Sequence, residues 1–326
     1  MLRLMMRDRS VIEWLSESDP ALRWQVERDL MGAPESVWQG TRGRVATEGY
    51  GARLLAQQGT DGQWAGGAFF PGPGFGMPED DGPGQPWVAT TPSLQQLREW
   101  GLDAERLAGT AAKLAANSRW EYDDLPYWDG EVDCCINAET LATGAWLGAD
   151  VSGVAHWLVE HAMEEGGWNC EWVEGSTRAS FHSTINALRG ILSFERAGLG
   201  FPELTAARHA GEEYLLCRHL LRRASDGELI GDWAAVFAYP FRWRFTVLKA
   251  VDHFLDAAAY DGVTPDPRLA EAIELIRSRR RPDGTWLQEA RYPGRAWFEV
   301  DVAPGEPSKW VTFYALRALR RWDARR

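Results

Sequence analysis

The sequence predicts an all-α fold, and three observations support that prediction. Apolar residues recur at helical spacing through most of the 326 residues. The alternation that indicates a β-strand is scarce, and its best example is the short segment from Trp297 to Val302. In addition, a turn in which Asp-Gly or Gly-Gly precedes tryptophan recurs between the helical segments. These features predict helix pairs that are joined by glycine turns.

The helical segments can be placed in order along the chain. The first apolar pattern runs from Val11 to Leu30 and is interrupted by Pro20, which predicts two short helices. We expect one domain over residues 1–326, in which residues 1–40 pack as an appended helical pair. Further apolar stripes at helical spacing occupy residues 44–57, 91–100, 104–117, 135–148, 151–163, 181–197, 203–223, 242–258, 267–280 and 308–322.

One segment departs from the helical pattern. Between Pro71 and Pro86, ten of 16 residues are glycine or proline. This composition predicts a long surface loop or a lid over residues 71–86. A disordered insertion is the alternative interpretation.

The composition excludes several classes of protein. Hydrophobic residues make up 45% and charged residues 25%, as in a globular protein. The net charge of −12 argues against a nucleic acid as the main partner. Four cysteines are too few for a secreted disulfide scaffold, the first ten residues are charged too early for a signal peptide, and no uncharged apolar run approaches the length of a membrane span. We therefore expect a cytoplasmic protein without integral membrane contact.

The recurring turn carries a family resemblance. Its copies are DGQW at 61–64, EGGW at 165–168 and DGTW at 283–286, and the first extends to QxxxGxW with Gln58, Gly62 and Trp64. This spelling resembles the QW signature of squalene–hopene cyclases and the repeats of protein prenyltransferase β-subunits. The resemblance runs from Gly51 to Arg320 and implies an (α/α) toroid, two concentric rings of helices around an apolar cavity. It also implies that Trp64, Trp168 and Trp286 join neighbouring helices rather than bind a ligand.

Two expected helix starts resemble a metal site of the same superfamily. VDCCIN places Asp133 and Cys135 at the start of segment 135–148, and SFHSTIN places His182 at the start of segment 181–197. Zinc-dependent protein prenyltransferases have similar strings, so the resemblance implies zinc bound by Asp133, Cys135 and His182. Independently of it, carboxylate, thiolate and imidazole are all good zinc ligands. Cys170, in GGWNCEW, is the candidate for a fourth ligand.

Each candidate ligand also has an interpretation without a metal. Asp133 suits the N-cap of the helix that follows it, and the cysteines can be small buried hydrophobic residues. His182 can be a hydrogen-bonded histidine at a helix start, although a helix N-terminus disfavours its charged form and so favours a neutral ligand. If Cys170 completes a shell of four ligands, the metal is structural. With three ligands, an open position remains for a substrate atom or an activated water.

The stretch before VDCC differs from the prenyltransferase pattern, which has basic residues for a diphosphate there. Residues 121–131 contain five acids and neither lysine nor arginine. Arg242, Arg244 and Lys249 are the candidates for positive charge from another helix. The acidic stretch disfavours the transfer of an allylic diphosphate, because the two anions repel each other.

A cyclase reaction would need a proton donor, which class II cyclases take from a DxDD motif. The nearest strings are PEDD at 78–81 and EYDD at 121–124. A degenerate cyclase would use Asp123 or Asp124, or Glu121, and would require Asp123 at the floor of the cavity with a raised pKa. A solvated acidic loop is the alternative.

The remaining aromatic residues are candidates for a cavity wall, although they can equally fill a wide core. The substrate-binding candidates are Trp87, Tyr127, Trp128, Trp233, Tyr239, Arg242 and Trp243.

Three functions follow from these interpretations. The first is a zinc-containing enzyme, a transferase or a cyclase or lyase, that acts on a hydrophobic or aromatic small molecule. The second is a non-catalytic toroid that binds an apolar ligand and holds a structural zinc. The third is the degenerate cyclase. Prenyltransferase β-subunits work with an α-subunit, so the resemblance also implies a second subunit as a partner. The sequence itself contains no independent indication of such a partner.

Overall fold

A computed structural model describes residues 2–75 and 85–324 of the chain, with side chains from residue 9 onward. Most of these residues are helical, which confirms the all-α prediction. The α-helices are α1 (Leu2–Ser16), α2 (Pro20–Asp29), α3 (Glu35–Gly43), α4 (Gly49–Leu55), α5 (Thr90–Glu99), α6 (Thr110–Asn117), α7 (Cys134–Leu147), α8 (Ser152–Glu160), α9 (Phe181–Arg196), α10 (Pro202–Leu216), α11 (Val247–Asp261), α12 (Ala270–Ser278) and α13 (Lys309–Asp323). Short 3₁₀ helices are η1 (Arg44–Ala46), η2 (Ala104–Leu107), η3 (Tyr127–Asp129), η4 (Cys170–Glu174), η5 (Asp232–Ala235) and η6 (Pro267–Leu269), and the strands β1 (Trp286–Leu287) and β2 (Pro307–Ser308) pair antiparallel.

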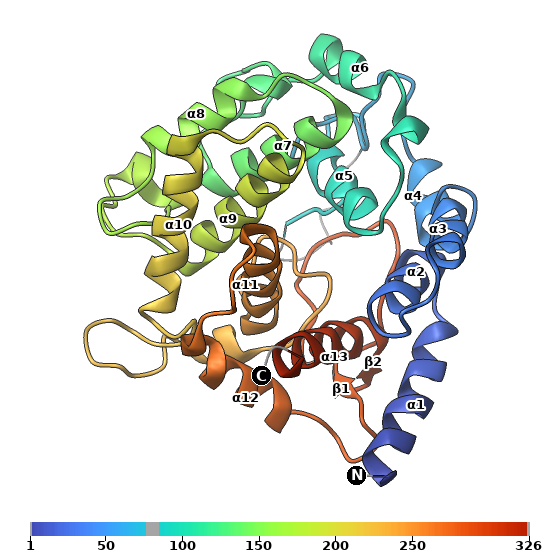
Figure 1. Cartoon of the computed structure of the whole chain (residues 1–326). Coiled ribbons are helices and arrows are strands. Elements are labelled where there is room, and N and C mark those ends of the chain that lie inside the picture. The colour runs from blue at the N-terminus through green and yellow to red at the C-terminus, as the bar shows by residue number, and fades with distance from the viewer. Residues whose placement is uncertain (1, 76–84, 325–326) are drawn as a thin grey trace.

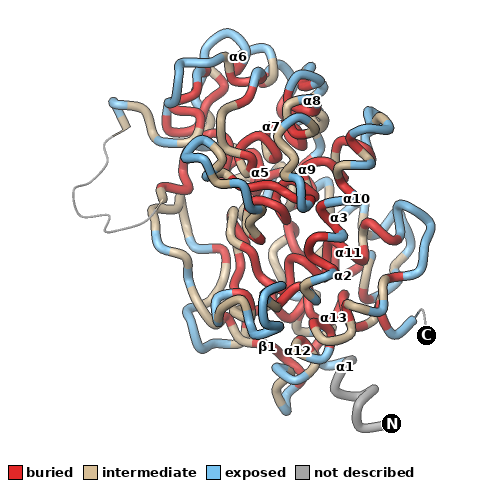
Figure 2. The backbone as a smooth tube through the Cα atoms, turned by 90° about the vertical axis from the view of Figure 1, so that its left-hand side faces the viewer, coloured by how far each residue is buried: buried red, intermediate tan, exposed pale blue. Residues whose placement is uncertain are grey.

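The helices differ in their distance from the middle of the molecule. In Figure 1, α5, α7, α9, α11 and α13 lie near the middle, and α4, α6, α8, α10 and α12 lie outside them. The inner helices are buried along most of their length, as the red tube in Figure 2 shows. Their sequences explain this burial, because apolar or small residues lie on most sides of α7, α9 and α11.

The tryptophans of the recurring turns join consecutive helices. Trp64, Trp168 and Trp286 are completely buried. Each indole Nε1 donates a hydrogen bond of 2.7–2.8 Å to the carbonyl ten residues earlier, near the end of α4, α8 or α12, where carbonyls lack a partner within the helix. The acceptors are Leu54, Leu158 and Ile276.

The backbone of the same tryptophans is bonded to the helix that follows. The N–H groups of Trp64, Trp168 and Trp286 donate to threonine hydroxyls at 2.9–3.1 Å. The acceptors are Thr90 in α5, Thr184 in α9 and Thr312 in α13. Each turn therefore links an outer helix to the next inner one, which confirms the structural role predicted for the three indoles. The glycines before them have φ of +91°, +77° and +92°, a conformation that glycine adopts without strain.

Helices α7 and α9 run side by side in the same direction. A Cβ atom on Gly190 of α9 would stand 2.4 Å from the Ala138 carbonyl of α7, so only glycine allows this close approach. Three residues before Ala138, Cys135 of α7 lies against the first turn of α9, where its Sγ is 4.0 Å from the His182 carbonyl oxygen. The close packing therefore brings the N-terminal ends of the two helices together.

The N-terminal region is part of the main core. Three helices, rather than the predicted pair, precede α4. Trp24 of α2 is buried and donates to the Trp100 carbonyl at the end of α5, and Asp29 of α2 forms a salt bridge of 3.1 Å with Arg317 of α13. Helix α2 is therefore packed against α5 and α13.

Some boundaries differ from the sequence prediction. The segment from Trp297 to Val302, the best example of strand-like alternation in the sequence, is irregular, and the two short strands flank it. Helix α10 ends at Leu216, and α11 begins at Val247, where the Thr246 hydroxyl caps it by accepting from the Lys249 N–H. The predicted helices 203–223 and 242–258 are therefore displaced at one end.

Two further predictions meet the limits of the described residues. The lid predicted for residues 71–86 and the PEDD string fall largely on residues 76–84, which lie outside the described part of the chain. Among the residues that are described, no helix has the length and apolar character needed to cross a membrane.

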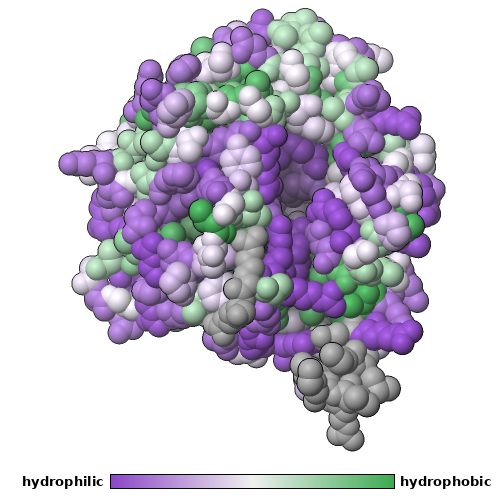
Figure 3. Space-filling model, in the orientation of Figure 1, coloured by the Kyte–Doolittle hydropathy of each residue, from purple (hydrophilic) through white to green (hydrophobic). Residues whose placement is uncertain are grey.

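The middle of the molecule contains a strongly charged cavity of about 230 Å³ among α2, α5, α9, α11 and α13. Figure 3 shows a hollow with hydrophilic walls near the middle of this face. Its charges largely pair with one another, as Arg317 and Asp252 do at 2.5 Å. The charged residues of its wall are Arg98, Glu99, Arg189, Arg196, Asp252, Asp256 and Arg317.

Candidate functional site

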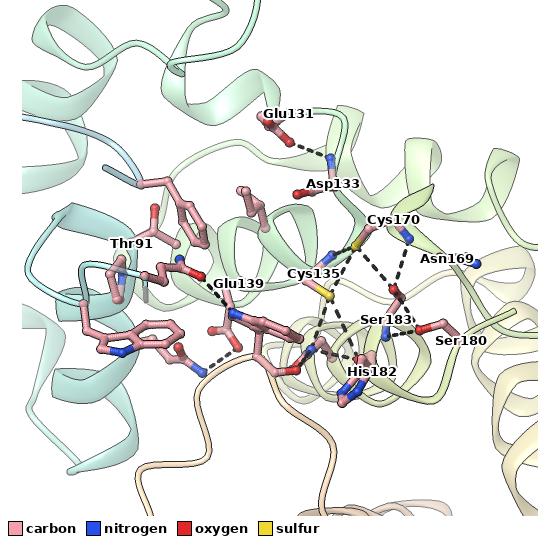
Figure 4. Close-up of a pocket in the computed structure, with 18 of the residues that line it drawn as sticks. Thr91, Glu131, Asp133, Cys135, Glu139, Asn169, Cys170, Ser180, His182 and Ser183 are labelled. Atoms are coloured by element: carbon pink, nitrogen blue, oxygen red, sulfur yellow. Dashed lines mark hydrogen bonds between the residues drawn. The ribbon is translucent and has the colours of Figure 1, made fainter. Parts of the chain in front are cut away.

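A second and larger cavity, of about 490 Å³, lies at the N-terminal ends of α7 and α9 (Figure 4). One part of its wall is apolar and aromatic, and the other carries thiols, carboxylates, amides and hydroxyls. The apolar residues are Phe69, Phe70, Trp87, Pro92, Ile136 and Trp243, and the polar ones are Gln85, Thr91, Gln95, Glu131, Asp133, Cys135, Glu139, Asn169, Cys170, Glu171, Ser180, His182, Ser183 and Asn186. All four residues predicted as zinc ligands line this one cavity.

The loop before α7 is held by the side chain of Asn137. Its Oδ1 accepts from the Glu131 N–H at 2.7 Å and its Nδ2 donates to the Glu131 carbonyl at 2.5 Å. The Asp133 N–H in turn donates to the Glu131 carboxylate at 2.5 Å. Asp133 occupies the N-cap position of α7 without a side-chain capping bond, and it lines the cavity.

Cys135 and Cys170 bring two thiols together at the end of the cavity. Their Sγ atoms lie 3.3 Å apart, and Figure 4 shows Asp133 beside them. The Cys135 N–H and the Ser183 hydroxyl point at the Cys170 sulfur, at 3.5 and 3.3 Å. Hydrogen bonds from the thiols of Cys134 and Cys135, and from Ser183, hold the pKa of Cys170 far below its ordinary value. Cys170 is therefore the first of these thiols to become a thiolate.

The same groups crowd negative charge around Asp133. Burial raises the pKa of Asp133 to about 7, and the charges of Cys170 and Glu131 add to that effect. Hydrogen bonding to Cys170 and burial likewise raise the pKa of Cys135. A cation in this position would relieve the repulsion among these three side chains.

His182 is arranged differently from the other three predicted ligands. In Figure 4 it lies on the other side of Cys135 from Cys170. Its Nδ1 accepts a hydrogen bond of 2.8 Å from the Phe245 N–H, and its ring packs on Trp233 and Trp243 at centroid distances of 4.6 and 5.4 Å. Burial, with the charges of nearby basic groups, lowers its pKa to about 4, so the imidazole is neutral at pH 7. Because Nδ1 accepts, Nε2 carries the proton.

Asn186 connects the thiol end of the cavity to a buried cation. Its Nδ2 donates to the Trp243 carbonyl at 2.6 Å and approaches the Cys135 sulfur at 3.3 Å. Its Oδ1 accepts from Lys249 Nζ at 2.5 Å, and Lys249 also donates to the Arg242 carbonyl. Burial lowers the pKa of Lys249 to about 8. The ammonium group of Lys249 is thus held by hydrogen bonds to Asn186 and the Arg242 carbonyl, and it does not line the cavity.

Only Trp87 and Trp243 of the seven predicted substrate-binding residues line the large cavity. Tyr127 is buried against Trp120 and bonded to Thr91, and Trp128 donates to a carbonyl of α6. Trp233 is 37% exposed and covers His182. Tyr239 and Arg242 line a separate cavity of only about 30 Å³. The structure therefore places these five residues outside the lining of the large cavity, which contradicts their prediction as substrate-binding residues of that cavity.

The EYDD string forms an exposed turn and does not reach the cavity. Asp123 and Asp124 are exposed and have left-handed φ of +57° and +54°. This placement contradicts their prediction as proton donors, because solvent surrounds both carboxylates. Glu121 instead accepts backbone hydrogen bonds of 2.9–3.1 Å from residues 68–70, so it positions Phe69 and Phe70 at the cavity wall.

Among the described residues, the group of possible metal ligands whose ligand atoms all lie within 4.8 Å of one another is His209, Glu212 and Asp261, and not the set predicted to bind zinc. However, Arg208 contacts Glu212 and Asp261 at 2.9 and 2.7 Å and already supplies a positive charge between them. This cluster is therefore an ion-pair network around a buried arginine.

Comparison with known proteins adds little to this geometry. No family model and no curated protein matches the sequence. A solved structure of a protein from Actinoplanes aligns with 94% of this chain and 90% of its own, at 18% identity and a TM-score of 0.45.

Proposed function

We propose that the chain is an (α/α) toroid of the terpenoid cyclase and prenyltransferase superfamily. The recurring tryptophan turns support this architecture, since each joins an outer helix to the next inner helix by the same pair of hydrogen bonds. The position of α5, α7, α9, α11 and α13 inside the other helices also supports it (Figure 1).

We further propose that the protein is a zinc-containing enzyme that acts on a small, largely apolar molecule in the large cavity. One observation carries this proposal: two thiols lie 3.3 Å apart beside a carboxyl group, at the end of a cavity of about 490 Å³ with an aromatic wall. Two sulfur ligands of a tetrahedral zinc lie about 3.8 Å apart at a Zn–S distance of about 2.3 Å, so a small side-chain rotation makes the pair fit.

The proposed ligands are Asp133, Cys135 and Cys170. Two thiolates and one carboxylate suit zinc, and the lowered pKa of Cys170 favours its ligating form. His182 would have to give up the Phe245 hydrogen bond in order to bind a metal, either directly through Nδ1 or through Nε2 after its proton moves to Nδ1. Three protein ligands leave one position open to the cavity, which favours an enzyme over a structural site.

Bound there, zinc supplies Lewis acidity or activates a thiol or a water molecule. The residues of the chain would do the rest of the binding. Trp87, Trp243 and Phe69 offer apolar surface to the body of the substrate. The Nε2–H of His182 offers one hydrogen-bond donor to a polar atom of the substrate.

Metal analysis of purified variants tests this proposal. We expect the parent protein, made with zinc in the medium, to hold about one zinc per chain. Cys135→Ser and Cys170→Ser should lose most of it, because each removes a thiolate ligand. His182→Ala should keep it. Cys217→Ser is the matched control, since Cys217 is an exposed thiol at the end of α10.

Two results would contradict the proposal. One is a parent protein without zinc, and the other is zinc that survives both Cys135→Ser and Cys170→Ser. Thermal unfolding of each variant by circular dichroism separates loss of metal from loss of fold.

A further inference from the structure

The large cavity has two chemically different ends. Phe69, Trp87 and Trp243 give part of its lining an aromatic surface, and Glu171, which follows Cys170 in the chain, also lines it. Figure 4 shows Glu131 and Asp133 on the side of the cavity where the thiols lie. Its lining contains neither lysine nor arginine within the part of the chain that the structure describes. The cavity is therefore amphipathic, and its polar end is acidic.

The charges at the acidic end lack cationic partners. Glu139 also lines the cavity, but it is bonded to Arg98 at 2.8 Å and to Gln95 at 2.9 Å. By contrast, Glu131, Asp133 and Glu171 form no salt bridge with any lysine or arginine whose side chain is described. Unpaired carboxylates beside an apolar wall repel an anionic ligand and attract a cationic one, because the wall screens charge poorly.

Positive charge lies behind the aromatic end. The guanidinium of Arg242 covers the Trp87 ring at 4.8 Å, and that of Arg244 covers the Trp243 ring at 4.8 Å. The ammonium group of Lys249 is bonded to Asn186 at the same wall. The field across the cavity therefore directs a positive group away from the indoles and toward Glu131 and Glu171.

We propose that the ligand of this cavity is an amphipathic organic cation, an amine or a quaternary ammonium compound with an apolar or aromatic body. Its body lies against Phe69, Trp87 and Trp243, and its charged head lies near Glu131 and Glu171. The inference rests on the proposed function, because it places the ligand in the cavity that was proposed to hold the substrate. It holds with zinc bound, because one carboxylate and two thiolates outweigh the two positive charges of the ion.

Three ligands with one carbon skeleton test this inference: phenylbutylamine, phenylbutanol and phenylbutyrate. Isothermal titration calorimetry on the full chain compares their affinities at pH 7. We expect the amine to bind about tenfold more tightly than the alcohol, and the carboxylate to bind least. Added salt should weaken the binding of the amine more than that of the alcohol.

Variants locate the charged head. Glu131→Gln and Glu171→Gln should each lower the affinity for the amine about 3- to 10-fold and leave the alcohol unchanged. Glu174→Gln is the matched control, because Glu174 lies on the same 3₁₀ helix as Glu171 but does not line the cavity. Thermal unfolding of the three variants and the parent confirms that they fold.

The inference is overturned if the amine binds no more tightly than the alcohol, which includes the case that neither binds, or if both glutamine variants keep the affinity of the parent. Zinc content measured on the same samples distinguishes this failure from that of the proposed function. A zinc-loaded protein without preference for the amine would refute only the ligand class.

Discussion

Trp168→Ala is expected to lower the free energy of unfolding by about 3–5 kcal/mol. The indole is completely buried and packs directly on Gly211 of α10, where a Cβ atom would stand 2.6 Å from its ring. Because Gly211 has no side chain, it cannot fill the space that the indole leaves. The substitution also removes the bond to the Leu158 carbonyl at the end of α8. Urea unfolding followed by circular dichroism measures the change.

Two comparisons sharpen this prediction. Trp168→Phe keeps most of the apolar surface and leaves the Leu158 carbonyl unpaired, for which we expect a loss of about 1–3 kcal/mol. Trp233→Ala removes an indole that is 37% exposed and should cost less than Trp168→Ala. Ordinary large-to-small core substitutions lower the free energy of unfolding by about 2 kcal/mol or more. If Trp168→Ala lowers it by less than about 1 kcal/mol, the indole does not join the two helices.

Arg208→Met is expected to have a similarly large effect, a loss of about 3–5 kcal/mol at pH 7. The Arg208 guanidinium is completely buried and contacts Glu195, Glu212 and Asp261 at 2.7, 2.9 and 2.7 Å. Its removal leaves three carboxylates without their cation. Arg268→Met is the matched control: Arg268 has contacts of 2.7 and 2.8 Å to Glu213 and Asp266, but it is partly exposed, so we expect less than about 1 kcal/mol.

The effect of Arg208→Met should depend on pH in a defined direction. Burial alone would raise the pKa of Asp261, but the hydrogen bonds and charge of Arg208 outweigh it and hold the pKa below its ordinary value. A lowered pKa in the folded state stabilises the protein above the pKa of the unfolded chain, and that stabilisation is lost as the pH falls through the folded value. The difference between parent and variant should therefore shrink below about pH 4. A constant difference from pH 7 to pH 3 would contradict this account.

The order of the helices follows closely from the sequence because each has a local signal. The stripe of α9 and the glycine turn that precedes it predict a helix over 181–197, and the helix observed is Phe181–Arg196. Helix α3 was missed, since its segment contains two glycines and few apolar residues. It packs on α2, where the ring of Trp38 lies 6.1 Å from that of Trp24.

The candidate site was predictable in part for the same reason. Asp133 and Cys135 stand at one helix start and His182 at another, and parallel inner helices bring their N-terminal ends together. The orientation of His182 was not predictable, because it depends on the backbone N–H of Phe245, 63 residues away in sequence. Glu131 and Asn186 were also missed, since nothing local marks a loop carboxylate or a helix amide as part of a cavity wall.

The aromatic candidates show a different limit. Trp87 and Tyr127 are equally plausible wall residues by composition, yet Trp87 faces the cavity while Tyr127 stacks on Trp120 in the core. Periodicity does not separate the two cases, because both residues lie in irregular segments or short 3₁₀ turns. The placement of Trp87 and Tyr127 depends on the path of the segments that connect the helices, and helical periodicity carries no information about that path.

The absorption spectrum of the cobalt(II)-substituted protein tests the central claim most directly, since cobalt(II) reports its ligands and geometry. For binding by Asp133, Cys135 and Cys170 with one open position, we predict an intense thiolate-to-cobalt charge-transfer band in the near ultraviolet and the strong visible bands of tetrahedral cobalt. Cys217→Ser should leave the spectrum unchanged. A weak octahedral spectrum without the charge-transfer band, or an unchanged spectrum in the Cys135→Ser, Cys170→Ser double variant, would contradict a metal–thiolate centre in this cavity.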